Sequence, residues 1–81
     1  MALFYFHTHD GKRYYPDVVG FELADERAAR AAALRAVTEM AWDTPLEEDQ
    51  HEFSVKVKNA NGDLIYEATF KLAGEWKKRL E

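Results

Sequence analysis

The sequence contains no cysteine, which excludes disulfide bonds, thiolate zinc sites and a cysteine nucleophile. It has only four glycines, and because they are scattered singly they form no phosphate-binding loop. No apolar run approaches the ~20 residues that a membrane-spanning helix needs. The opening residues MALFYFHTHD lack the basic start and the small-residue cleavage site of a signal peptide. These absences together predict a cytoplasmic protein with no membrane partner.

What is present is the composition of one small folded domain. The chain has 81 residues, 47% hydrophobic and 32% charged, and is too short to divide into several domains. Five Phe, four Tyr and two Trp are its main anchors, since each aromatic side chain can bury ~150–250 Å². Fifteen acidic against eleven basic residues give a net charge of −4. This balance argues against nucleic acid as a partner, because binding to the phosphate backbone needs a basic surface.

The N-terminal part of the chain predicts two or three short strands. Residues 3–9 are rich in aromatics and can alternate between two faces. Asp10-Gly11 follows at once and is a strong hairpin signal, because glycine tolerates a positive φ. Residues 12–15 would form the return strand, and residues 18–23 a further extended segment.

Residues 26–42 predict one helix, because nearly all of them are good or tolerable helix formers. Asp25 precedes them as an N-cap, whose carboxylate accepts from free N–H groups of the first turn. At 100° per residue, one face of this helix gathers Ala29, Ala33, Ala36, Val37 and Met40. Such a small-residue face lets the helix sit close to a sheet, with Phe4 and Phe6 filling the space that the alanines leave.

The C-terminal half predicts a second hairpin. Residues 53–58 alternate apolar and polar side chains, as expected for a half-buried strand. Asn61-Gly62 would close the turn, and residues 64–72 would form the partner strand.

The order of these elements predicts an α+β fold: a small, mainly antiparallel sheet with one helix packed on one face, in ββ(β)-α-ββ order. Residues 1–72 would form the single domain. Residues 73–81 would form a C-terminal tail or a short helix, and Leu80-Glu81 also fit a remnant of a cloning vector.

A single helix covers one face of a sheet and leaves the other face open. In a domain this small, apolar burial hardly exceeds the ordering entropy, so a second copy on the open face or along a sheet edge would add missing stability. The sequence therefore predicts a homodimer; the alternative is a monomer whose tail covers part of the open face. The expected interface residues are Tyr5, His7, His9, Ile65, Trp42 and Trp76.

His7 and His9 are the residues that most resemble a chemical site. Two histidines at i and i+2 on a strand point to the same side, as paired metal ligands do. Asp10, His51 or Glu52 would have to complete the set, since zinc without cysteine needs three or four such ligands. An interface or structural role accounts for the pair equally well, and the sequence predicts no metal.

A nucleophile is also missing from this region. Thr8 lies between the two histidines in sequence but points to the opposite face, so it cannot form a nucleophile–base pair with either. The carboxylates have structural explanations as turn or cap residues. We therefore expect no catalytic residue and no cofactor.

The pattern resembles a family of small uncharacterised proteins, mostly from alphaproteobacteria, known as a domain of unknown function. The resemblance covers residues 3–72 and implies no activity. It rests on Tyr5-Phe6-His7, Asp10-Gly11, Asp17, Gly20, Glu22-Leu23, Ala28-Ala29-Arg30, Ala33 and Asn61-Gly62.

A partial resemblance to HicB-type antitoxins covers about a third of the chain. Tyr15-Pro16-Asp17-Val18-Val19-Gly20 followed by the alanine-rich segment 25–36 is similar to the hairpin, turn and helix of those proteins. The Gly-Asp-Thr that usually precedes their helix is absent, and so is their DNA-binding extension. This resemblance implies a fold and a capacity to bind a protein partner.

The function expected from the sequence is a non-catalytic, cytoplasmic protein-interaction or regulatory module that forms a homodimer. One alternative is an antitoxin-like protein that holds a different protein partner and, with it, nucleic acid. The other is a metal-binding protein or enzyme that uses His7, His9 and Asp10.

Overall fold

The computed structural model describes residues 1–78 and contains one helix and a mainly antiparallel sheet, which confirms the predicted α+β class. The order along the chain is β-β-β-α-β-β. The bounds are β1 Ala2–His9, β2 Tyr14–Tyr15, β3 Phe21–Leu23, α1 Glu26–Asp43, β4 Gln50–Asn59 and β5 Leu64–Ala73. Within the described part of the chain, no helix combines the length and the apolar character that crossing a bilayer requires.

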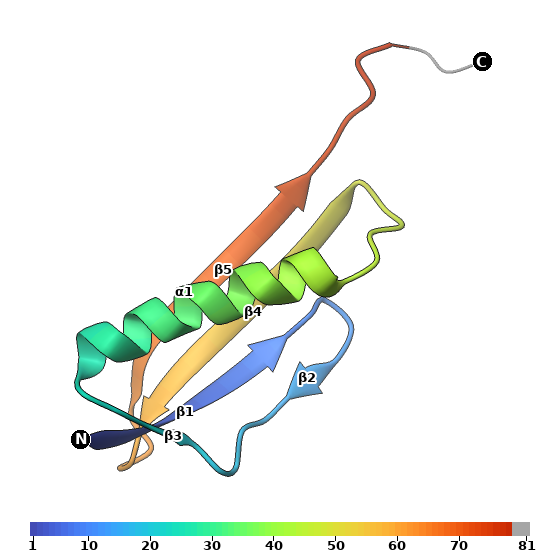
Figure 1. The fold of residues 1–81 in the computed structure, drawn as a ribbon. Coiled ribbons are helices and arrows are strands. Elements are labelled where there is room, and N and C mark those ends of the chain that lie inside the picture. The colour runs from blue at the N-terminus through green and yellow to red at the C-terminus, as the bar shows by residue number, and fades with distance from the viewer. Residues whose placement is uncertain (79–81) are drawn as a thin grey trace.

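The sheet has the order β2-β1-β4-β5, and β3 pairs with the same strand as β2. All of these pairings are antiparallel. Figure 1 shows α1 lying across one face of the sheet, with β5 at one edge and the short strands β2 and β3 at the other. The sheet therefore has two unlike edges and only one covered face.

The helix begins where its cap requires. The Asp25 carboxylate accepts a hydrogen bond from the Ala28 N–H at 2.9 Å, so Glu26 opens the first turn with one of its free donors satisfied. Ala29 and Ala33 are fully buried. Because their side chains are single methyl groups, α1 approaches β4 and β5 closely.

The core lies between this helix face and the central strands. Its buried residues are Phe4, Ala29, Ala33, Val37, Phe53, Val55 and Val57. Phe4 and Phe6 face the helix as predicted, the second as a half-buried side chain at the border of the cluster. A core of this size is small, so each pairing and turn matters to the stability of the domain.

Several boundaries differ from the sequence prediction, among them the extended segment predicted over residues 18–23, of which only Phe21–Leu23 form a strand. β4 begins at Gln50 rather than residue 53, because its pairing with β5 continues through polar residues as far as Gln50 opposite Ala73. The return strand after the first hairpin is only Tyr14–Tyr15 long, because the turn extends to Arg13, whose carbonyl accepts from the Asp10 N–H. The helix ends one residue later than expected, at Asp43.

Ile65 was expected on the open face, and this was wrong. A β-bulge between Val57 and Lys58 shifts the register, so that Lys58 pairs with Leu64 and Val57 pairs with Tyr66. Ile65 becomes the extra residue and packs against the helix-side core, while Leu64 takes the open-face position.

The segment after β5 forms no helix in residues 74–78 and continues beyond the end of the strand (Figure 1). The Gly74 N–H donates to the Asp49 carbonyl at 2.6 Å, which fixes the point where the chain leaves the sheet. Trp76 is 69% exposed and contributes nothing to the core. The remainder of the predicted tail or helix, and the suggested vector remnant Leu80-Glu81, lie outside the described residues.

Candidate functional site

The turn after β1 is organised by the Asp10 side chain. Its Oδ1 accepts from the N–H groups of Lys12 at 2.8 Å and Arg13 at 2.7 Å. Its Oδ2 accepts from the Tyr15 hydroxyl at 3.2 Å. The backbone hydrogen bonds from Arg13 and Lys12 lower the pKa of Asp10 below its ordinary value. Asp10 is thus an ionised turn-forming residue.

His7 and His9 each use a ring nitrogen inside the fold. The Asp17 N–H donates to His7 Nδ1 at 3.0 Å, and the Gly11 N–H donates to His9 Nδ1 at 3.0 Å. A ring nitrogen that accepts a hydrogen bond carries no proton, so each neutral ring holds its proton on Nε2. A histidine binds a metal through a free nitrogen lone pair, but here the Nδ1 lone pair already accepts a hydrogen bond from a backbone N–H. The two histidines therefore act as acceptors that fix the turns following β1.

Asp17, like Asp10, accepts three hydrogen bonds, but one of them comes from the backbone of a distant strand, β1. Its Oδ1 accepts from Val19 and Gly20, at 3.0 and 2.9 Å. Its Oδ2 accepts from the N–H of Phe6, a residue of β1, at 3.1 Å. Partial burial raises the pKa of Asp17, but the hydrogen bonds from Gly20, Phe6 and Val19 together outweigh this and lower the pKa below its ordinary value.

These contacts make Asp17 the residue that ties the turn between β2 and β3 back to β1. The sequence analysis gave Asp17 only a role in the resemblance. A signal was available, because an Asp followed three residues later by Gly is typical of a side chain that caps its own turn. The contact with β1 carries no such signal, since it depends on where the chain returns.

His51 lies apart from the other two histidines. Its position on β4 alternates with the buried Phe53, which places it on the helix side, whereas His7 and His9 lie on the open face. Its ring stacks on Phe53 with 4.4 Å between centroids, and its Nε2 contacts the carbonyl oxygen of Asp10.

The ligand set suggested by the sequence is therefore not assembled. His51 reaches Asp10 only through the backbone carbonyl, and each of the three rings already has an internal partner. Among residues 1–78, no group of three or more His, Cys, Asp or Glu side chains is placed to hold a metal ion.

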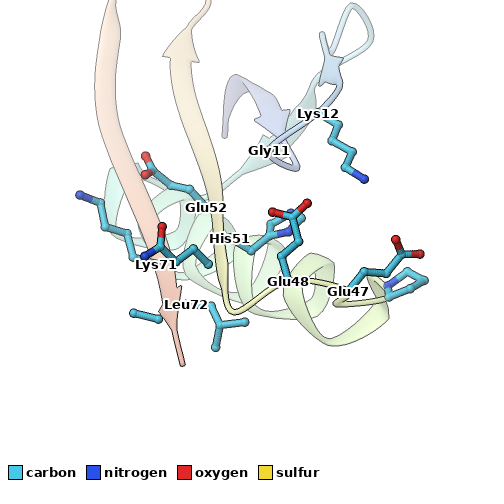
Figure 2. A pocket seen from close by; sticks show the side chains of 11 residues that line it. Gly11, Lys12, Glu47, Glu48, His51, Glu52, Lys71 and Leu72 are labelled. Atoms are coloured by element: carbon cyan, nitrogen blue, oxygen red, sulfur yellow. The ribbon is translucent and has the colours of Figure 1, made fainter. Parts of the chain in front are cut away.

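One depression of about 510 Å³ opens beside His51. Figure 2 shows that its side chains come from the turn after β1, the loop before β4, the first residues of β4, and β5. Acidic Glu47 and Glu48 face basic Lys12 and Lys71 around it. Among residues 1–78, no hydroxyl or thiol side chain lines it.

The open face carries a second shallow depression, of about 500 Å³. It is lined by His7, Thr8, His9, Tyr14, Ser54, Lys56, Lys58, Gly62 and Leu64. Most of these lining residues have polar side chains. Tyr5, His7 and His9 do lie together on that face, but Lys56 and Lys58 stand directly across from them on β4.

The two tryptophans proposed as interface residues are both on the surface. Trp42 is 89% exposed in the last turn of α1, and Trp76 is 69% exposed beyond β5. Neither belongs to the hydrophobic core or to the half-buried side chains packed against it.

The edge strand β5 is a further candidate contact surface. It runs for ten residues, LIYEATFKLA, with no proline and no glycine. Within residues 1–78, no strand pairs with its outer side. Phe70 is 39% exposed there although its ring packs edge-on against Phe53, with 6.3 Å between centroids. The strand therefore presents unpaired backbone groups next to apolar surface.

The fold and its surfaces define a small α+β domain with one edge of short strands, one long edge that no strand covers, and no metal-binding cluster among residues 1–78. A family model described as domain of unknown function (DUF6894) matches residues 3–71. The chain belongs to this family, which confirms the predicted membership in a family of unknown function. Neither the curated proteins nor the solved structures contain a significant match to the chain.

Proposed function

We propose that the chain is a non-catalytic, cytoplasmic protein-interaction or regulatory module that works as a homodimer, with β5 as its contact element. The observation that carries this proposal is the ten-residue outer edge of β5, which no strand among residues 1–78 covers. A strand edge of this kind binds by adding a further strand, because its unpaired N–H and C=O groups are arranged for a ladder.

The internal use of the chemical groups supports a binding role over a catalytic one. His7 Nδ1, His9 Nδ1 and the Asp17 carboxylate accept hydrogen bonds from the backbone of two turns. An acceptor atom held by backbone N–H groups is not free to take a proton from a substrate.

The proposed contact is the sheet edge, the second of the two surfaces that the sequence suggested, and not the open face. The open face is crossed by charged and polar side chains of β4, and Ile65 packs on the other side of the sheet. The double substitution of Tyr5 and Ile65 to alanine, which would test an open-face dimer, is therefore confounded by damage to the core.

An antitoxin-like protein that holds a different protein partner is the second candidate. The turn after Pro16 favours it, because Asp17 fixes this turn between a hairpin and an alanine-rich helix. Such a partner would use the same free edge, since strand addition does not require identical chains.

The deciding experiment measures the molar mass of the full chain by light scattering, from micromolar to near-millimolar concentration. Thr69→Lys places a charge on the outer strand and should give a monomer, because two lysines would then approach across the edge. Thr38→Lys makes the same exchange on the exposed side of α1 and should leave a dimer.

A monomeric mass at every concentration overturns the homodimer. If that monomer also binds a different protein from cell lysate, and Thr69→Lys abolishes the binding, the antitoxin-like candidate takes its place.

A further inference from the structure

We propose that a second copy of the chain pairs antiparallel along β5 about a twofold axis at Thr69, which joins the two sheets into one. This inference rests on the proposed function and specifies its contact residue by residue. The pairing sets Glu67 of each copy opposite Lys71 of the other.

The first argument is that this edge lacks the usual protection against pairing. Natural sheets blunt their edges with proline, very short strands, bulges, charged side chains or covering segments. β5 has ten residues without proline or glycine, its one bulge lies near the Asn61-Gly62 turn, at Val57 and Lys58 of its neighbour, and its charges Glu67 and Lys71 have opposite signs. The opposite edge is protected, since β2 and β3 have two and three residues.

The second argument concerns which registers symmetry allows. A twofold axis perpendicular to a sheet brings together residues that point to the same face. On β5 the open face carries Glu67, Thr69 and Lys71, because their partners on β4 alternate with the buried residues. The allowed registers therefore differ only in the residue that lies on the axis.

Charge then selects among these registers. With Thr69 on the axis, Glu67 of each copy faces Lys71 of the other, so the contact contains two opposite-charge pairs. With Glu67 or Lys71 on the axis, two like charges would face each other, which destabilises a sheet. With Ala68 or Phe70 on the axis, no opposite-charge pair forms at these positions.

The charged groups are free to make these pairs. Among residues 1–78, neither Glu67 nor Lys71 takes part in an ion pair, and both are exposed. Inside the chain, their cross-strand neighbours are Lys56 and Glu52 respectively. The proposed contact thus extends an alternation of charge that β4 and β5 already share.

The helix side of the edge fits the same register. There Tyr66 would face Leu72, and Ala68 would face Phe70, so that each large side chain meets a smaller one. Both copies of α1 would lie on the same side of the joined sheet. The 39% of Phe70 that is exposed in the single chain would be covered by this contact.

Charge exchange tests the register on the full-length chain. Glu67→Lys alone and Lys71→Glu alone each create two like-charge pairs, and each should raise the dimer dissociation constant by about tenfold or more. An equal mixture of the two variants should restore a dimer of near wild-type affinity, because every pair is again of opposite charge. Lys58→Glu, on the open face of β4 away from the edge, should have no effect.

A disulfide tests the same axis without relying on charge. The chain has no cysteine, so any disulfide forms at the introduced position. Thr69→Cys should give a covalent dimer under mild oxidation, since a residue opposite itself in an antiparallel pair has Cα atoms about 4.5–5.5 Å apart. Ser54→Cys, the cross-strand neighbour on the inner strand, should form no disulfide-linked dimer under the same conditions.

The outcomes separate the register from the function. A dimer in which Thr69→Cys does not link, or in which the mixed charge variants fail to restore binding, overturns the register and leaves the homodimer standing. A monomer at every concentration overturns both. Circular dichroism of each variant establishes that a loss of association is not a loss of folding.

Discussion

The two edges of the sheet differ in how their backbone hydrogen-bonding groups are satisfied. At one edge, β2 and β3 together contribute only five residues, and the chain between them is drawn back onto β1 by Asp17. At the other, β5 contributes ten residues with nothing among residues 1–78 against its outer side. At the short edge side chains satisfy the backbone, whereas the outer backbone groups of β5 pair with no strand among residues 1–78.

The two edges therefore differ in which groups satisfy their backbone N–H and C=O groups. The side chains of His7, His9, Asp10 and Asp17 satisfy nearby backbone at the short edge. No such side-chain contact to the outer backbone of β5 exists among residues 1–78. Removal of a single side chain at the short edge should therefore lower the stability of the fold. A change at β5 should instead weaken the association of two chains.

Removal of Asp17 should break the short edge with the largest effect. Asp17→Ala leaves the N–H groups of Phe6, Val19 and Gly20 without their acceptor, which should cost about 3 kcal/mol of unfolding free energy. Urea denaturation measures this loss.

Asp17→Asn is the matched variant. Its carbonyl oxygen can still accept from Val19 and Gly20, but its amide nitrogen faces the Phe6 N–H, so it should lose less stability than Asp17→Ala. Equal losses for the two variants would contradict this division of the contacts. If the edges are independent, the molar mass of a folded variant should not change.

Gly20→Ala and Gly62→Ala should differ although both glycines have positive φ. Both substitutions meet the backbone penalty of the left-handed region, about 1 kcal/mol. At Gly20 an added Cβ would also lie 3.0 Å from Leu3 Cδ1 and 3.1 Å from the Phe4 carbonyl oxygen, whereas at Gly62 nothing lies within 4 Å. We expect a loss of about 2 kcal/mol at Gly20.

Thermal melting of the two variants measures this difference. If Gly62→Ala proved as damaging as Gly20→Ala, the close packing of the short edge against β1 would not be the cause.

Two exposed phenylalanines compare the edges directly. Phe21 is 60% exposed and meets Phe6 edge-on at 5.8 Å, and Phe70 is 39% exposed and meets Phe53 edge-on at 6.3 Å. Replacement of either by alanine should cost about 1 kcal/mol of stability in the single chain. Only Phe70→Ala should also weaken the dimer, as measured by sedimentation. If Phe21→Ala weakened the dimer, the contact between the two copies would lie at the short edge and not at β5.

Acid should lower the unfolding free energy through the short edge, by less than the substitutions above. The pKa of Asp10 and that of Asp17 are both lowered in the folded chain, from an ordinary value of 3.8. Their stabilising contribution is therefore complete above the unfolded pKa of about 4 and is lost as pH falls through the folded values.

Unfolding free energies measured between neutral pH and pH about 3 should decline more steeply for the wild type than for Asp17→Asn, which cannot titrate at that position. Parallel curves for the two proteins would show that Asp17 does not contribute to the acid sensitivity.

Local signals in the sequence predicted much of this fold. The cap at Asp25, the alanine face of the helix and the Asn61-Gly62 turn are decided by residues within a few positions of each other. The facing of Phe4 and Phe6 also followed from simple alternation along one strand.

The candidate site was predicted less well, because its residues act through contacts distant in sequence. His7 and His9 were recognised as a pair on one face, but their acceptor roles depend on the backbone of Asp17 and Gly11. Asp17 bonds to Phe6, eleven residues earlier, and no local pattern announces that contact.

Ile65 shows the same limit within a strand. Perfect alternation would place it on the open face, but one bulge transfers it to the core and sends Leu64 outward. A bulge is a property of the pairing between two strands, so neither strand taken alone specifies it.

The sequence by itself determined the kinds of element, their order and the absence of cysteine chemistry, because these depend on composition and short-range periodicity. Only the tertiary structure decided that β1 lies between the short strands and β4, and that β5 is left at the edge. The physical reason is that strand order and register are fixed by burial and backbone pairing between distant segments. These pairings join residues that are far apart in the sequence, so no local sequence pattern specifies them.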